Sequence, residues 1–423
     1  MREAREIKIG TNNSSFAQLL AIFLLGISSG FPLALTASGG TFQSLATDRG
    51  FSLVELGKLT VLTLPFALKF LWAPFFDRFA CPFFSFLGFR KGWLVATQLA
   101  LALLYLRLGV SYEVNLNLIL LLFALSFMSA SQDIVVDAYR AELLSPKLRG
   151  AGASFAVMGY RIGMILSGAG ALALGDSLPW EVILSICALV QLLACVPVVF
   201  APREPQVARP RTLASAVINP FSEFWRRSGA IEILIFIFLY KAPDALGTLF
   251  TTRFLMDCGF SRTDIAAVVK GIGLAATLVG GLLAGAVMVR IPMRRTLFLF
   301  GIFQAITIIP FIILAQVSVV HHASGALLVA VIVAESLGSG MSSTAFVAFL
   351  MGLCKVEFAA TQFALLSSVA VLARSLLGPA AGFVANEFGW EIYFIIAGLM
   401  NLPALWILYL RGGRWTLAGG EKL

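Results

Sequence analysis

Apolar segments long enough to cross a lipid bilayer follow one another along almost the whole 423-residue chain. A hydrocarbon core about 30 Å thick is crossed by roughly 20 apolar residues in a helix. Because a β-barrel would instead show short alternating segments, every span is predicted to be an α-helix. The twelve expected spans are residues 16–37, 53–76, 93–110, 115–139, 151–175, 180–200, 230–250, 264–289, 296–317, 325–352, 361–385 and 390–410.

Composition excludes a water-soluble fold. Hydrophobic residues make up 59% of the chain and charged residues 13%, against about 25% charged in ordinary soluble domains. The five cysteines have neither paired nor metal-type spacing, so we expect no disulfide framework and no metal site. A phosphate-binding glycine loop and a Ser–His–Asp set are also missing from the sequence. We therefore expect an all-α integral membrane protein without catalytic residues or cofactors.

The basic residues indicate orientation. Of 31 Lys and Arg residues, 21 fall in the even-numbered loops and the two tails, five in odd-numbered loops or adjoining span ends, and five inside spans. Since positive residues stay on the cytoplasmic side, both termini are expected there, the N-terminal segment being a tail and not a removable signal. The net charge of +9 is thus a topology signal and predicts no nucleic-acid partner.

The chain divides into two halves of six spans. Residues 1–200 form the first half, the hydrophilic stretch 201–229 a cytoplasmic linker, and residues 230–423 the second half. A weak repeat relates the halves, since GFPLAL (30–35) corresponds to KAPDAL (241–246) and GFSLVEL (50–56) to GFSRTDI (259–265). Two pseudo-symmetric six-helix halves are typical of major facilitator-type transporters, in which the substrate site lies near the membrane midplane.

Carboxylates inside the spans are the first candidates for function. An ionisable group at the bilayer centre costs roughly 2.5–3.5 kcal/mol and is tolerated where it faces water or an opposite charge. Asp133, Asp244 and Glu335 fall in the fourth, seventh and tenth spans, which line the cavity in this architecture. A carboxylate in a partly dry setting can load and release a proton, so these three are the candidates for proton coupling. For Glu335 the alternative is a serine-rich stretch that serves only helix packing.

Arg161 is the expected partner of Asp133 or of a substrate carboxylate. It follows Tyr160 in a glycine-rich span in which Gly159 and Gly163 form a small-xxx-small pair, a pattern that lets another helix approach closely. A planar guanidinium suits bidentate carboxylate binding. A purely structural ion pair is the alternative.

Lys241 and Asp244 flank Pro243, which predicts a broken or kinked helix with backbone groups free to contact a ligand. The alternative is a Lys–Asp pair that satisfies itself.

Charged residues near the cytoplasmic ends suggest a gate. Asp77 and Arg78 follow the second span, and Asp137 and Arg140 end the fourth. Asp77 and Arg78 are predicted to latch the halves in one state, together with the basic loop residues Arg90, Lys91, Arg290, Arg294 and Arg295. Asp137 and Arg140 are predicted to gate the loops. The alternatives are a simple orientation signal for the loops and snorkelling side chains for Asp137 and Arg140.

Long ordered motifs resemble the AmpG-type muropeptide permeases of the major facilitator superfamily. They run from about residue 30 to 389 and include GFPLALTASGGTFQSL, LKFLWAPFFDR, SASQDIVVDAYRAELL, RGAGASFAVMGYRIGM and LYKAPDAL. The resemblance implies import of anhydromuropeptides (GlcNAc-anhydroMurNAc and its peptides) across the bacterial inner membrane for peptidoglycan recycling, driven by the proton gradient as symport. Acetyl-CoA transporters share the superfamily, so acetyl-CoA or a siderophore is the alternative cargo, and a sensor that does not transport is a third class.

A muropeptide carries carboxylates, an ammonium group, hydroxyls and amides, which suits a cavity of mixed charge. The predicted substrate-binding residues are Gln132, Tyr160, Arg161, Lys241, Gln362 and Arg374. Beyond substrate and lipid bilayer no partner is expected, and the protein is predicted to be a monomer.

Overall fold

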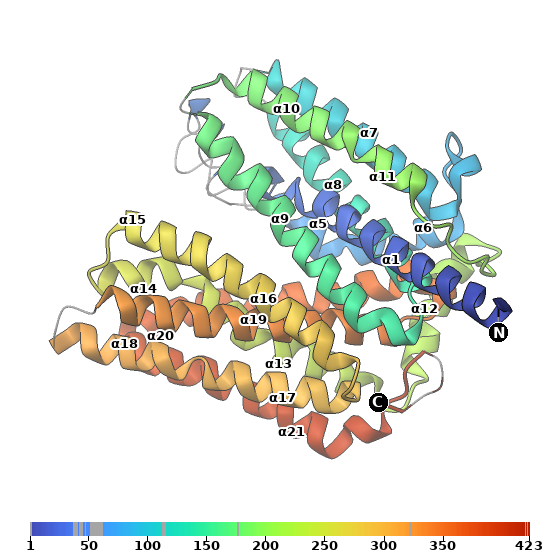
Figure 1. The fold of residues 1–423 in the computed structure, drawn as a ribbon. Helices are drawn as coiled ribbons and strands as arrows, with labels where there is room; N and C mark the ends of the chain where they lie inside the picture. Colours follow the sequence, from blue (N-terminus) through green and yellow to red (C-terminus); the bar gives the residue numbers. More distant parts are fainter. Residues whose placement is uncertain are drawn as a thin grey trace. The chain divides into compact units, whose positions relative to one another are not determined.

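The computed structural model describes the backbone of residues 2–36, 41, 45–46, 48–50, 62–111, 116–175, 177–320, 324–418, 420 and 422–423. Within these residues the chain is helical, apart from loops and one isolated β-bridge between Thr416 and Lys422 (Figure 1).

The chain forms two compact units. Unit 1 comprises Met1–Pro220 together with Cys354–Leu365, and unit 2 comprises Phe221–Leu353 and Leu366–Leu423. The first boundary falls within the expected linker. The segment Cys354–Leu365 belongs to the second half by sequence, yet it packs into unit 1.

The long helices of unit 1 correspond to the spans expected in the first half. Its elements are α1 (Arg2–Gly30), α2 (Leu33–Thr36), α5 (Leu64–Leu68), η2 (Lys69–Leu71), α6 (Ala73–Arg78), η3 (Ser85–Leu87), α7 (Phe89–Gly109), α8 (Leu116–Leu143), η4 (Pro146–Leu148), α9 (Arg149–Gly175), α10 (Trp180–Leu193) and α11 (Cys195–Phe200). Helix α12 (Leu213–Trp225) follows in the linker, and η6 (Val356–Phe358) lies in the segment Cys354–Leu365.

The second half is built in the same way. Its elements are α13 (Ala230–Leu249), α14 (Thr251–Asp257), α15 (Arg262–Ile265), a π-helical turn η5 (Ala266–Ile272), α16 (Gly273–Met288), α17 (Met293–Ile306), α18 (Ile309–Val320), α19 (Gly325–Leu353), α20 (Ala359–Leu399), α21 (Asn401–Arg411) and η7 (Gly412–Arg414).

Most of the expected spans are found. In the described part of the chain nine helices are long and apolar enough to cross a membrane, and α13 with α14, bent by 41°, makes a tenth if the pair is one span. Of the two remaining expected spans, the first contains the apolar helix Ser15–Gly30. The second, 53–76, begins in residues 53–61, which lie outside the described residues. The eleventh and twelfth spans run together in α20 and are separated at Gly389, whose φ is 79°.

The expected break at Pro243 is wrong. Helix α13 continues through Pro243 and ends at Leu249, so the bend lies at Phe250, seven residues later. Proline removes one backbone hydrogen bond, and the rest of the ladder keeps the helix intact here.

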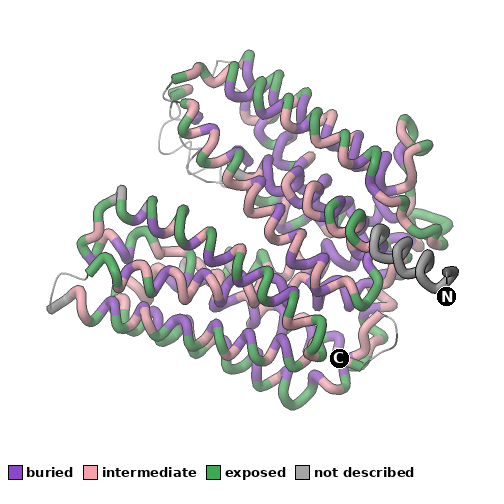
Figure 2. The backbone as a smooth tube through the Cα atoms, viewed as in Figure 1, coloured by how far each residue is buried: buried purple, intermediate pink, exposed green. Residues whose placement is uncertain are grey.

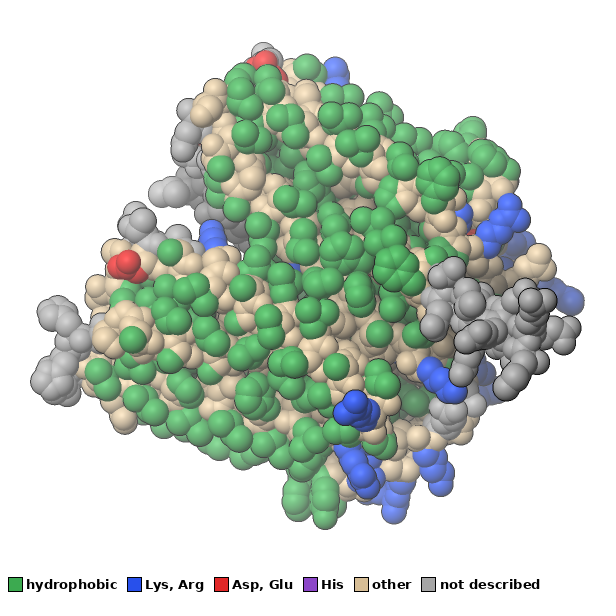
Figure 3. Space-filling view, in the orientation of Figure 1, with side chains coloured by type: hydrophobic (Ala, Val, Ile, Leu, Met, Phe, Trp, Pro, Cys, Tyr) green, Lys and Arg blue, Asp and Glu red, His purple; other side chains and the backbone are tan. Residues whose placement is uncertain are grey.

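Apolar side chains cover much of the outer surface of both units. Figure 2 shows exposed residues running along the outward sides of the long helices, and Figure 3 shows apolar atoms over most of that surface. Phe127 and Leu166 of unit 1 and Leu282 and Leu376 of unit 2 are among these exposed side chains. On the face shown, Lys and Arg gather near helix ends. This distribution is typical of helices surrounded by lipid.

Two helix pairs pack backbone against backbone. A Cβ added to Gly163 of α9 would lie 2.1 Å from the Ile27 carbonyl oxygen of α1, and one added to Gly30 would lie 2.0 Å from the Tyr160 carbonyl oxygen. The close approach predicted from Gly159 and Gly163 is therefore confirmed. In unit 2, α16 and α19 meet in the same way, because a Cβ at Gly340 would lie 2.2 Å from the Thr277 carbonyl oxygen.

Candidate functional site

Unit 1 contains a buried group of polar side chains between four helices. We call it the serine–glutamine cluster: Ser28 and Ser29 of α1, Gln98 of α7, Gln132 and Asp133 of α8, and Gln191 of α10. Gln98 and Gln132 each donate to Ser28 Oγ, at 2.9 and 2.7 Å, and Gln191 Nε2 lies 3.4 Å from the Ser28 carbonyl oxygen. A serine thus joins three glutamines from three different helices.

Asp133 is bound by Ser29, whose hydroxyl donates to carboxylate Oδ1. The expected ion pair with Arg161 is not formed, and Arg161 pairs with no acid among the residues that the structure describes. Asp133 is 8% exposed, and its neighbour one turn later, Asp137, takes the nearest cations instead. The reason lies in the packing, because Ser29 of α1 fills the position beside Asp133.

The cluster has acceptor capacity that the described chain does not use. The amide oxygens of Gln98, Gln132 and Gln191 are buried and receive no hydrogen bond from any described residue. Each of these side chains is fully buried. Buried acceptors are almost always satisfied, so these atoms can accept donors from outside the chain, such as ordered water. Sequence reasoning found Gln132 but missed Gln98 and Gln191, although a glutamine inside an apolar span was the signal.

The neighbouring predicted residues Tyr160 and Arg161 lie on α9, where it packs against α1. Both side chains are half-buried, so neither is sealed off as the glutamines are. The side chain of Arg374, the corresponding residue expected in the second half, lies outside the described residues.

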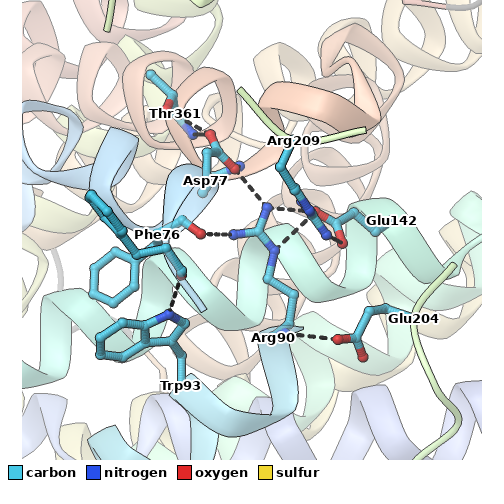
Figure 4. Close-up of polar contacts among 10 residues, drawn as sticks. Phe76, Asp77, Arg90, Trp93, Glu142, Glu204, Arg209 and Thr361 are labelled. Carbon is cyan, nitrogen blue, oxygen red and sulfur yellow. Dashed lines mark hydrogen bonds and ion pairs between the residues drawn. The ribbon is translucent and has the colours of Figure 1, made fainter. Parts of the chain in front are cut away.

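A network of buried charges lies where α6, α7 and α8 come together (Figure 4). The Arg90 guanidinium donates to Asp77 Oδ1 at 2.6 Å, to Glu142 Oε1 at 2.5 and 2.9 Å, and to the Phe76 carbonyl oxygen at 2.7 Å. The side chains of Asp77, Arg90 and Glu142 are completely buried. Arg209 of the linker adds two bonds to Glu142, at 2.7 and 2.9 Å.

Asp77 also binds the beginning of α20. Its carboxylate accepts from the backbone N–H groups of Ala360 and Thr361, at 3.1 and 2.8 Å, and from the Thr361 hydroxyl at 2.7 Å. The first N–H groups of a helix have no partner within it, and the positive end of the helix dipole favours a carboxylate. Asp77 therefore caps a helix that begins about 280 residues later in the chain.

The other predicted gating residues differ in whether they form an ion pair with a described residue. Asp137 is paired with Arg140 at 2.7 Å and with Lys69 at 3.4 Å. The Arg140 guanidinium also lies over the Phe363 ring, 4.8 Å from its centroid, so it too contacts the segment Cys354–Leu365. Arg78, by contrast, lies over the Phe79 ring and forms no ion pair with a described residue.

Both ends of the Gln362 side-chain amide form hydrogen bonds with backbone groups. Its Oε1 accepts from Lys355 N at 2.8 Å and its Nε2 donates to the Pro220 carbonyl oxygen at 3.2 Å. The side chain is 1% exposed. Both ends of the amide hold local structure, and the substrate-binding role predicted from sequence therefore does not fit this geometry.

Unit 2 has a second polar cluster around Asp244. Lys241 Nζ lies 2.6 Å from Asp244 Oδ2, and Ser339 donates to Oδ1 at 2.7 Å with Gln304 at 3.4 Å. Lys241 also reaches Ser343 at 3.2 Å. The self-satisfied pair, left open as the alternative, is the arrangement found.

Glu335 lies on α19 with its side chain half-buried. Its Oε2 accepts from the adjacent Ser336 at 3.4 Å. One α-helical turn separates it from Ser339, which binds Asp244.

The two clusters use corresponding places of the repeat. Each draws side chains from the first helix of its half, a glutamine from the third (Gln98 of α7, Gln304 of α17) and polar residues from the fourth (α8, α19). The difference is charge, because the first cluster has an aspartate bound by the neutral Ser29 hydroxyl and the second a complete Lys–Asp pair. Among the described residues no set of three His, Cys, Asp or Glu side chains is arranged to hold a metal.

Comparison with known proteins identifies the family. The family model described as Major Facilitator Superfamily matches residues 19–376. The chain belongs to the Major Facilitator Superfamily. Within that superfamily, the anhydromuropeptide permease of Escherichia coli (strain K12) is 37% identical over 393 residues, which cover 92% of this chain and 78% of the relative. A putative transporter AmpG 4 of Rickettsia conorii is 33% identical over 402 residues, which cover 92% of this chain and 95% of the relative. The resemblance to AmpG-type permeases is thereby confirmed.

Solved structures of other transporters share the fold. The proton:xylose symporter XylE superposes with a TM-score of 0.70 at 14% identity, covering 97% of this chain and 98% of the symporter. A bacterial homologue of the iron transporter ferroportin, in an outward-facing state, superposes with a TM-score of 0.69 at 16% identity, covering 94% of this chain and 98% of the homologue.

Proposed function

We propose that this protein imports anhydromuropeptides, GlcNAc-anhydroMurNAc and its peptides, for peptidoglycan recycling. The observation that carries the proposal is the 37% identity to an anhydromuropeptide permease over 92% of the chain. Two polar clusters inside otherwise apolar helices support it, because a cargo with charged and hydroxyl groups needs polar contacts within the membrane.

Proton symport is proposed to run through Asp133. A proton carrier must exist in a charged and a neutral form during the cycle. Asp133 is bound by a neutral hydroxyl, whereas Asp244 is held in an ion pair with Lys241 and two further donors. That geometry makes Asp244 the weaker candidate. Glu335, half-buried on α19, is the second candidate.

Substrate carboxylates are proposed to bind Arg161, Lys241 and Arg374, with Tyr160 and Gln132 contacting sugar and amide groups. Arg161 is the strongest of these, since its guanidinium is half-buried and pairs with no acid among the described residues. A planar guanidinium can donate two parallel hydrogen bonds to one carboxylate.

Asp77, Asp137 and Arg140 are proposed to gate the transport path. Asp77 supports the start of α20 through three hydrogen bonds. Arg140 stacks on Phe363 in the segment Cys354–Leu365. Release of this segment is proposed to accompany one step of the transport cycle.

The protein is proposed to work as a monomer in the bacterial inner membrane with both termini in the cytoplasm. The excess of Lys and Arg in the even-numbered loops and tails supports this orientation.

Uptake into proteoliposomes tests the function. Radiolabelled GlcNAc-anhydroMurNAc tripeptide is expected to accumulate when the interior is alkaline, and excess unlabelled muropeptide is expected to abolish the signal while acetyl-CoA leaves it unchanged. Loss of the signal with acetyl-CoA alone would instead support the anionic-carrier alternative. Saturable binding without counterflow would indicate a sensor.

A further inference from the structure

Helix α12 (Leu213–Trp225; Figure 1) lies in the linker between the two halves and carries buried, exposed apolar and polar residues around its circumference. One face points inward, since Ala216, Pro220 and Phe224 are buried. These three residues recur every fourth position and form a single stripe on the helix. The stripe accounts for the packing of α12 against the protein.

The second face is apolar and exposed. Leu213, Val217, Ile218 and Trp225 are 49%, 42%, 61% and 60% exposed. At about 100° per residue, these four side chains fall within an arc of about 140° that overlaps the edge of the buried stripe, with Leu213 between Pro220 and Phe224. A helix on a water-soluble surface would carry polar residues there.

The third face is polar. Ser215, Asn219 and Ser222 complete the circumference, and the first two stand on the side away from the exposed apolar residues. A helix with one face on protein, one apolar and one polar is suited to the boundary between lipid and water.

Two arginines flank α12 in the sequence, one before its first residue and one after its last. The guanidinium groups of Arg211 and Arg226 are exposed and bind no other residue that the structure describes. Their neighbours are different, since Arg209 pairs with Glu142 and Arg227 pairs with Glu223. Arg211 and Arg226 therefore present free positive charge at the two ends of α12.

The C-terminal end of α12 lies close to the beginning of the next long helix. Trp225 precedes the first residue of α13 by five positions, so even a fully extended chain leaves it within about 18 Å of the beginning of that helix. Tryptophan is enriched at this depth, where its ring sits among the headgroups.

We propose that α12 lies in the membrane interface, with Leu213, Val217, Ile218 and Trp225 in the acyl boundary and Arg211 and Arg226 bound to the phosphates of anionic phospholipids. The exposed apolar arc supplies the insertion, and the flanking cations supply the preference for anionic lipid. Under the proposed orientation this is the cytoplasmic leaflet. The contact with lipid is independent of which substrate is carried.

Spin-label accessibility on the full chain in proteoliposomes tests the insertion. Ile218→Cys and Val217→Cys report the apolar face, with Asn219→Cys and Ser215→Cys as controls on the polar face of the same helix. The signal of wild-type protein treated with the same reagent is subtracted, because four of its cysteines are buried and Cys195 is half-buried. Labels at 217 and 218 are expected to be more accessible to oxygen and less accessible to a water-soluble nickel chelate than those at 215 and 219.

Two results would overturn the insertion. Equal chelate accessibility at all four positions would place α12 in water. Protection of 217 and 218 from both oxygen and chelate would mean that protein, such as a second copy, covers the face.

The lipid preference is tested with the label at position 218 in two membranes, phosphatidylcholine alone and phosphatidylcholine with phosphatidylglycerol. Phosphatidylglycerol is expected to raise oxygen accessibility severalfold relative to the chelate, and Arg211→Gln with Arg226→Gln is expected to remove that increase. Lys147→Gln, an exposed lysine outside α12, is expected to keep it. An increase that survives the double substitution would contradict the role of the two arginines.

Discussion

Arg90→Ala is expected to lower the free energy of unfolding by about 3–5 kcal/mol, because it leaves the buried Asp77 carboxylate without its cation and Glu142 with Arg209 alone. Asp77 and Glu142 are completely buried and both bind this guanidinium. The variant also strands the Phe76 carbonyl oxygen, which accepts from Arg90 at 2.7 Å. Denaturant titration of the purified protein in detergent provides the measurement.

Two further variants grade the effect. Arg209→Ala is expected to lower the free energy of unfolding by a smaller amount, because Arg209 is partly exposed and Glu142 keeps its ion pair with Arg90. Lys147→Ala, on an exposed side chain, is expected to be neutral. If stranded charge is the cause, Asp77→Asn added to Arg90→Ala will recover part of the loss, because Arg90 is the cation paired with Asp77 among the described residues. An Arg90→Ala protein as stable as Lys147→Ala would show that the network contributes little.

Gly163→Ala is expected to destabilise unit 1 by about 1–3 kcal/mol, the usual cost of overpacking. The added Cβ would lie 2.1 Å from the Ile27 carbonyl oxygen, and backbone cannot rotate away as a side chain can. α1 must therefore move away from α9, and with it Ser28 and Ser29, which hold the serine–glutamine cluster.

Gly170 provides a matched control on the same helix. No atom lies within 4 Å of a Cβ added there, so Gly170→Ala is expected to be neutral or to stabilise by up to about 1 kcal/mol through helix propensity. Thermal unfolding of the two variants in one detergent compares them directly. Equal melting temperatures would mean that the close α1–α9 approach does not contribute to stability.

Sequence reasoning predicted the features that depend on local pattern. The apolar runs located the spans, and the spacing of Gly159 and Gly163 predicted a close helix contact that the structure contains. Asp77 was singled out as a gating residue, but its bond to the start of α20 was not foreseen. That bond joins residues 284 positions apart, and no local pattern indicates which helix end will lie beside a given carboxylate.

The partner of Asp133 was mispredicted for a related reason. Charge alone favoured Arg161, but a neutral serine on α1 binds the carboxylate. Hydropathy gives the depth of a residue and its helical face, whereas the neighbouring helix is decided by packing. Gln98 and Gln191 were missed because an uncharged amide changes the hydropathy of a span only slightly, while its hydrogen bonds depend entirely on the tertiary fold.

The central claim is that Asp133 couples muropeptide movement to protons, and one comparison tests it most directly. Asp133→Asn keeps an oxygen that can accept from Ser29 but can no longer carry a proton. In proteoliposomes this variant is expected to exchange labelled GlcNAc-anhydroMurNAc tripeptide for unlabelled substrate at a rate near wild type, yet to lose accumulation driven by a pH gradient. Accumulation at the wild-type level by Asp133→Asn would contradict the account.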